Sequence, residues 1–191
     1  MKTSGKIARS LCSRALVSGG LALSLWACQF ASTTRTFEES WEIGNTKIAR
    51  GDYKGAQQEF ESALRKDPNN PNLLMLRGLA QAEQGKLILA IEDYSQALLE
   101  KPDLYQALVH RGNAYNQLLQ LDKALFDFSQ AIVIQPENAV ALSNRAMTYY
   151  NLGQRKEAIA DLEQAKALLE KEKATVNVAK VEQLLKEYQA D

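Results

Sequence analysis

The chain has 191 residues, and its 23 Lys plus Arg balance 23 Asp plus Glu, so it carries no formal net charge. This balance and the scatter of the charges exclude the concentrated basic face of a nucleic-acid-binding protein. The charges recur at helical spacing, so we expect them to lie on solvated helix faces.

The first 27 residues have the composition of a signal peptide rather than of a folded domain. Four basic residues come first, and the uncharged segment 15–27 follows them. This order is typical of a secretory signal, and the apolar segment is shorter than the about 20 residues that a membrane span needs. We therefore expect residues 1–27 to be a signal peptide.

A cysteine follows this segment directly, in the sequence Leu25-Trp26-Ala27-Cys28. The segment resembles a bacterial lipobox, in which a small residue precedes the thiol that receives lipid, although Trp26 is larger than the usual residue at its place. The resemblance implies a lipoprotein with acylated Cys28, a polar tether over residues 28–36, and a position on a membrane of the bacterial cell envelope, facing the periplasm or the exterior. An uncleaved signal anchor and an ordinary secretory cleavage are the alternatives.

From residue 37 onward the sequence repeats with a step of 34 residues. Two sets of alanines, one set of prolines and one set of small residues keep this step: Ala56, Ala90, Ala124 and Ala158; Ala63, Ala97, Ala131 and Ala165; Pro68, Pro102 and Pro136; Gly44, Gly78, Gly112 and Ala146. A fixed period of this length is the signature of a solenoid of helix pairs. It divides the chain into the units 37–70, 71–104, 105–138 and 139–172.

Each unit contains two amphipathic segments that are separated by a short turn, and proline ends the first three units. Taken in register, these positions resemble the tetratricopeptide (TPR) pattern. Two positions depart from it, because Trp41 stands one place later than the usual tryptophan and Glu170 replaces the last proline. The resemblance implies an all-α, right-handed solenoid of four TPR helix pairs with a C-terminal capping helix.

Residues 173–191 contain one further amphipathic stretch, whose apolar side carries Val178, Val181, Leu184, Leu185 and Tyr188. A last repeat leaves an apolar face that a further repeat would have covered, so we expect this segment to be a capping helix. A separate partner-binding helix is the alternative.

The resemblance also implies that the first helix of each pair lines a concave groove. The groove positions here are rich in amide and apolar side chains, and amides can both donate to and accept from a peptide backbone. We expect the partner-binding residues to be Trp41, Asn45, Asn72, Met75, Leu79, Gln106, Val109, Asn113, Asn116, Ser143, Met147 and Tyr150. The family's chaperone-tail subgroup grips a terminal carboxylate with basic residues at places that here carry Trp41, Gln106 and His110, so we do not expect that ligand.

The sequence contains no catalytic constellation. Its one histidine, His110, stands alone, no His/Cys cluster has the spacing of metal ligands, and no glycine-rich phosphate loop is present. We therefore expect no enzyme activity, no cofactor, no metal and no small-molecule substrate. The favoured function is a membrane-tethered scaffold that binds a peptide segment or helix of a protein partner, for example in assembly of an envelope or membrane complex. The alternative is a structural, self-associating envelope protein.

Overall fold

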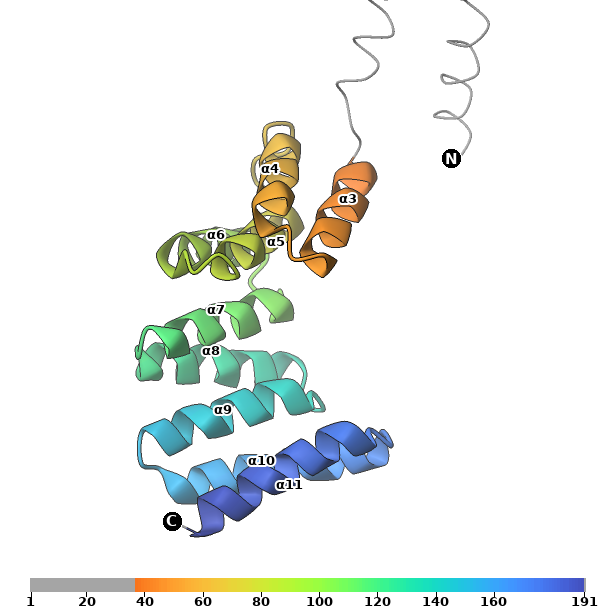
Figure 1. The fold of residues 1–191 in the computed structure, drawn as a ribbon. Coiled ribbons are helices and arrows are strands. Elements are labelled where there is room, and N and C mark those ends of the chain that lie inside the picture. The colour runs from red at the N-terminus through yellow and green to blue at the C-terminus, as the bar shows by residue number, and fades with distance from the viewer. Residues whose placement is uncertain (1–36, 191) are drawn as a thin grey trace, which may run out of the picture.

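The computed structural model describes residues 37–190, and these residues fold into nine helices without any strand (Figure 1). The helices are α3 (Phe37–Ala49), α4 (Tyr53–Leu64), α5 (Pro71–Ala82), α6 (Leu87–Glu100), α7 (Tyr105–Gln117), α8 (Leu121–Ile134), α9 (Ala139–Asn151), α10 (Arg155–Lys171) and α11 (Thr175–Ala190). Within this part of the chain, every helix is too short or too polar to span a bilayer. The predicted signal peptide, Cys28 and the tether lie outside the described residues.

The helices form four successive pairs with α11 at the end, and each helix packs against the next along the chain. Figure 1 shows the pairs stacked into a curved array with α3 at one end and α11 at the other. The first helix of each pair begins where the corresponding predicted unit begins, at Phe37, Pro71, Tyr105 and Ala139. The predicted all-α solenoid with a terminal helix is therefore confirmed.

The turns inside the pairs share one left-handed backbone conformation, which is unfavourable for any residue other than glycine. Gly51, Gly85 and Gly153 have φ angles of 75°, 77° and 74°, and Leu119 has a φ angle of 56° at the same place in the third unit. The third turn therefore closes in the left-handed region without a glycine. A side chain in this region costs about 1–2 kcal/mol.

Close packing inside each pair explains the recurring small residue on the first helix. A Cβ atom at Gly78 would lie 2.8 Å from the Tyr94 ring, and one at Gly112 would lie 2.7 Å from the Phe128 ring. These rings are almost fully buried and fill the space between the two helices. The fourth unit has Ala146 instead of glycine, and a leucine, Leu162, replaces the larger ring.

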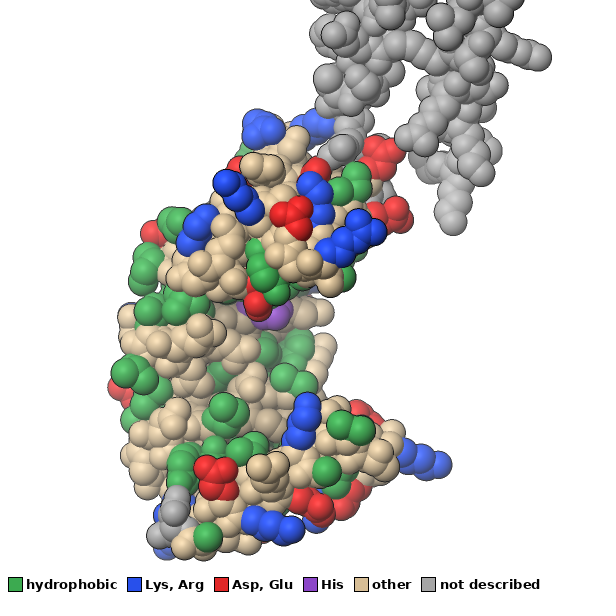
Figure 2. Space-filling view, viewed as in Figure 1, with side chains coloured by type: hydrophobic (Ala, Val, Ile, Leu, Met, Phe, Trp, Pro, Cys, Tyr) green, Lys and Arg blue, Asp and Glu red, His purple; other side chains and the backbone are tan. Residues whose placement is uncertain are grey.

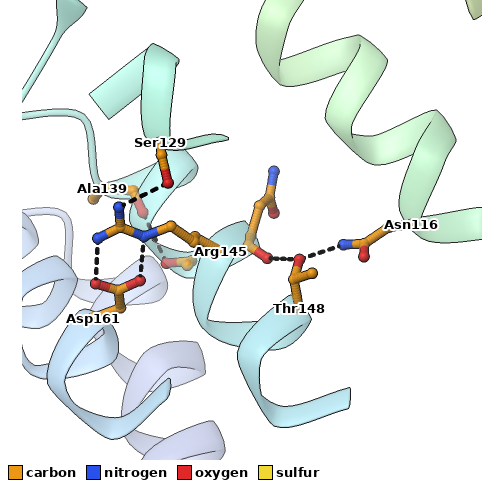
Figure 3. Close-up of polar contacts among 8 residues, drawn as sticks. Asn116, Ser129, Ala139, Arg145, Thr148 and Asp161 are labelled. Carbon is orange, nitrogen blue, oxygen red and sulfur yellow. Dashed lines mark hydrogen bonds and ion pairs between the residues drawn. The ribbon is translucent and has the colours of Figure 1, made fainter. Parts of the chain in front are cut away.

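A ladder of buried ion pairs also follows the 34-residue step, and the sequence analysis missed it. Arg77, Arg111 and Arg145 each donate two hydrogen bonds to an aspartate on the second helix of their own unit: Asp93, Asp127 and Asp161. Figure 3 shows Arg145 between Asp161 and Ser129, which belongs to the preceding unit and accepts a third hydrogen bond.

This ladder corrects the prediction that the charges lie on solvated faces. The side chain of Asp127 is 1% exposed, and Arg111 also donates to Ser95 of the unit before it, at 3.0 Å. Each arginine of the third and fourth units therefore ties its own two helices to the preceding pair. The first unit has no arginine–aspartate pair at these positions; instead, Lys47 forms an ion pair with Glu59 at 3.1 Å.

The terminal helix α11 packs against α10, as a capping helix should. Its buried residues Val181, Leu185 and Tyr188 join the apolar cluster of the fourth unit. Because Glu170 replaces the proline that ends the other units, α10 continues to Lys171 before the chain turns. The Tyr188 ring then stacks on Tyr150, with the ring centres 3.8 Å apart.

Candidate partner-binding surfaces

The first helices of the pairs, α3, α5, α7 and α9, carry all the predicted partner-binding residues. We call the surface formed by these residues the concave face. Figure 2 shows that the molecule curves around a hollow on one side. Whether a predicted residue can contact a partner depends on the exposure of its side chain and on the hydrogen bonds that the side chain already makes.

Most of the predicted residues reach the surface of the concave face. Gln106 and Met147 are exposed. The half-buried residues are Trp41, Asn45, Asn72, Leu79, Asn113, Asn116, Ser143 and Tyr150. These residues can contact a partner without a change in the fold.

Two of the predicted residues do not lie on this surface. Met75 and Val109 are each only 7% exposed and belong to the continuous apolar core of the first three units. The prediction that they hold a partner's side chains is therefore wrong for this conformation. They lie on inner helices that contact one another, α5 against α7, and the apolar contact between units buries them.

The asparagines of α7 are partly occupied by hydrogen bonds between units. Asn116 donates to the Thr148 hydroxyl at 2.8 Å, and Asn144 donates to the Asn113 side-chain oxygen at 3.0 Å (Figure 3 shows the first of these). The Asn116 side-chain oxygen is buried and has no hydrogen-bond partner among the described residues. Asn116 therefore contributes to the α7–α9 contact. Asn113 uses only its side-chain oxygen in this contact, so its amide nitrogen can donate a hydrogen bond to a ligand.

The imidazole of His110 adds no positive charge to this part of the concave face. His110 stacks on Tyr94 with ring centres 5.9 Å apart. Burial lowers the pKa of the His110 imidazole below its ordinary value, and the Glu83 carboxylate opposes this shift only in part. The imidazole is therefore neutral at pH 7, and a partner segment meets no positive charge there.

A second surface, on the opposite side of the array, was not found in the sequence analysis. Large apolar side chains are exposed on the second helices of the two middle pairs: Ile88, Leu89 and Leu99 on α6, with Phe126, Val133 and Ile134 on α8. We call these six residues the outer apolar patch, and Figure 2 shows hydrophobic side chains along the side over α6 and α8. The signal was present in the repeat, because the first unit carries Arg65 where the two middle units carry Leu99 and Val133.

The described residues bring together no metal-binding group of three or more His, Cys, Asp or Glu side chains. The buried carboxylates of the ladder are held by arginines, and His110 faces a tyrosine ring rather than a nucleophile.

Comparison with known proteins agrees with the fold. Models of the tetratricopeptide repeat family match residues 42–105, 105–138 and 138–172. A search of curated protein sequences found no match.

Three solved structures illustrate the similarity. TTC0263, a thermophilic TPR protein from Thermus thermophilus, is 25% identical, with 75% of this chain and 80% of that chain covered and a TM-score of 0.65. MamA is 21% identical, with 79% and 90% covered and a TM-score of 0.61. The first TPR of Spaghetti (RPAP3), bound to the HSP90 peptide SRMEEVD, is 26% identical, with 59% and 89% covered and a TM-score of 0.57. Because the family models together span residues 42–172 and the helix pairs follow the same step, the chain belongs to the tetratricopeptide repeat proteins.

Proposed function

We propose that this protein is a lipid-anchored scaffold of the bacterial cell envelope that holds an extended, largely uncharged segment of a protein partner on its concave face. The observation that carries the proposal is the composition of this face. Its accessible side chains are mainly amides, aromatic rings and aliphatic groups, with the Ser143 hydroxyl among them, and its groove positions contain no lysine or arginine; the exposed Glu83 is a carboxylate beside them. Such a surface suits a peptide backbone with apolar side chains.

The related structures support the binding of a peptide and also limit its chemistry. The first TPR of Spaghetti holds the peptide SRMEEVD, and the second TPR domain of human RPAP3 holds SGPTIEEVD. Both peptides end in an acidic sequence. A run of carboxylates would find no cation at the groove positions of the present chain, so we do not expect a tail with several adjacent carboxylates as its ligand.

The membrane part of the proposal is based on the sequence alone. The basic and apolar leader and the cysteine at position 28 support a lipid anchor, and the short tether would keep the solenoid beside the bilayer. A partner held there would be a membrane protein or a protein assembled at the membrane, such as a component of an envelope complex.

Two added charges on the concave face test the binding site. Gln106→Lys with Met147→Lys places two unpaired ammonium groups where the proposed segment lies, and we expect about tenfold weaker recovery of partners by crosslinking in native membranes. The matched control is Gln130→Lys with Gln164→Lys, because both glutamines are exposed on second helices, away from the concave face. Equal recovery by the two double variants would place the binding site elsewhere.

The outer apolar patch favours a second candidate function, which is self-association. Leu99 and Val133 are 75% and 74% exposed, and they occupy equivalent positions on neighbouring units. An exposed apolar patch on a soluble domain commonly marks an interface. In this case light scattering would show a mass that rises with concentration, and Leu99→Glu with Val133→Glu would return the protein to a monomer while partner recovery stayed unchanged.

A further inference from the structure

A pocket of about 380 Å³ opens between the start of α9 and the capping helix α11. Its lining residues come from both helices and from the end of α10: Ala139, Val140, Ser143, Asn144, Leu169, Asn177, Lys180, Val181 and Leu184. We call it the α9–α11 pocket. One of its residues, Ser143, is a predicted partner-binding residue of the fourth unit, so the pocket lies at the end of the concave face.

Two small residues explain why a pocket forms at this place. Ala139 and Ser143 stand one 34-residue step after Tyr105 and Val109, which are both buried in the third unit. At both of these equivalent positions, the third unit therefore has a large side chain and the fourth unit has a small one. The space that Tyr105 and Val109 fill between α7 and its neighbours is left open between α9 and α11.

The pocket combines an apolar interior with a polar rim. Leu169 and Val181 are buried in its wall, and Val140 is exposed beside it. Asn144 uses its amide nitrogen to reach Asn113, and its side-chain oxygen has no partner in the described part of the chain. Such an oxygen can accept a hydrogen bond from the backbone of a bound segment.

Lys180 gives the pocket its single charged side chain. It is exposed, and within residues 37–190 it forms no ion pair. Its ammonium group therefore stands at the edge of an apolar cavity, next to a concave face that carries no cation of its own. Charge complementarity calls for one carboxylate at this end of the bound segment.

We propose that the α9–α11 pocket is a binding site for one large aliphatic side chain of the partner segment, with an acidic residue next to it in the sequence whose carboxylate meets Lys180. This inference rests on the proposed function and adds the chemistry of the ligand. It also makes α11 a wall of the binding site, in addition to its role as a cap.

A short peptide probe tests the pocket without knowledge of the natural partner. The probe is acetyl-Ser-Gly-Leu-Asp-Gly-Ser-amide with a photoreactive leucine, added to the full chain in detergent micelles. After irradiation, we expect labelled fragments that contain Val140, Val181 or Leu184. A probe with Gly in place of Leu should compete at least about tenfold less well, and one with Asn in place of Asp about three- to tenfold less well.

Variants of the protein locate the effect. Ala139→Tyr with Ser143→Val copies the residues of the third unit and should reduce labelling at least about tenfold, because the larger side chains fill the pocket. For Val140→Glu we expect the same reduction in labelling, and because Val140 is exposed at the rim, this change leaves the core unaltered. Lys180→Glu should lower labelling by the Leu-Asp probe but not by the Leu-Asn probe, and Lys156→Glu on α10 is the matched control.

The outcomes separate this inference from the proposed function. Labelling outside the pocket, no labelling at millimolar probe, or labelling that Ala139→Tyr with Ser143→Val and Val140→Glu leave unchanged would overturn the inference. If the probe labels the pocket while Gln106→Lys with Met147→Lys leaves partner recovery intact, the site stands and the proposed function fails. Labelling that falls as the protein concentration rises, with the probe kept in large excess, would support a second copy as the occupant and also overturn the inference.

Discussion

Replacement of Asp127 by alanine removes the most deeply buried carboxylate of the ion-pair ladder. In the wild-type protein this carboxylate accepts two hydrogen bonds from Arg111, at 2.8 and 2.7 Å. A hydrogen bond to a charged group contributes about 1.5–3 kcal/mol, and breaking a buried pair by removing one partner costs about 3–5 kcal/mol. Because the Arg111 side chain is 17% exposed and keeps its bond to Ser95, water can solvate part of it, so we expect the lower limit, about 3 kcal/mol.

This loss should be visible in thermal unfolding followed by circular dichroism. For a chain of this size, about 3 kcal/mol corresponds to a melting temperature lower by about 6–12 °C. The control is Glu137→Ala, which breaks the pair of Lys171 and Glu137, whose side chains are 71% and 77% exposed. An exposed pair contributes at most about 1 kcal/mol, so the control should change little. If Asp127→Ala and Glu137→Ala shifted the melting temperature equally, the argument that the buried Arg111–Asp127 pair stabilises the fold would be refuted.

Four further changes test other parts of the account. Cys28→Ser should leave an uncleaved precursor in membranes, and mass spectrometry that finds an unmodified cysteine in the mature protein would contradict the lipid anchor. Leu119→Gly should raise the melting temperature by a few degrees, because it relieves about 1 kcal/mol of strain at a positive φ angle and removes an exposed side chain; a lower value would contradict this. Burial lowers the pKa of His110, so its neutral form contributes stability that is complete above the unfolded value of about 6.5 and is lost as the pH falls below it. His110→Gln should therefore lose less stability than wild type between pH 7 and pH 5 in denaturant titrations, and an equal loss would be evidence against the burial of a neutral imidazole. Deletion of residues 175–191 should expose the apolar cluster of the fourth unit, lower the melting temperature and cause aggregation, whereas unchanged solubility and melting would show that α11 is not a cap.

The repeat made the fold predictable, because the positions that define it are the ones that packing requires. A small residue at Gly78 or Gly112 is needed for a buried ring on the facing helix, and both members of each contact keep the 34-residue step. For the same reason, the first helices of the pairs begin at Phe37, Pro71, Tyr105 and Ala139, one step apart. The turn at Leu119 could not be settled in this way, because only the backbone geometry shows that a leucine adopts the glycine conformation.

The charged part of the repeat was misjudged for a physical reason. Charges at helical spacing usually lie in water, and this expectation hid the fact that Arg111 and Asp127 keep the same step as their counterparts in other units. A periodic arginine with a periodic aspartate 16 residues later is a signal of buried pairing that a comparison of the units could have found.

The concave face was only partly predictable. Groove positions place a residue on the correct helix, but they do not show how closely the next inner helix approaches, so the burial of Met75 and Val109 was missed. The stacking of Tyr188 on Tyr150 depends on the placement of α11, which lies outside the repeat register. The α9–α11 pocket follows from the same placement together with the small residues of the fourth unit.

The most direct test of the account is site-specific photocrosslinking in native membranes. A photoreactive amino acid at Met147, which is exposed on the concave face, is compared with the same amino acid at Phe126, which is exposed in the outer apolar patch. The account predicts that the adduct at Met147 contains a partner protein and that mass spectrometry identifies the crosslinked peptide as a segment with few charged residues. Adducts that form at Phe126 and not at Met147 would contradict the central claim that the concave face holds the partner.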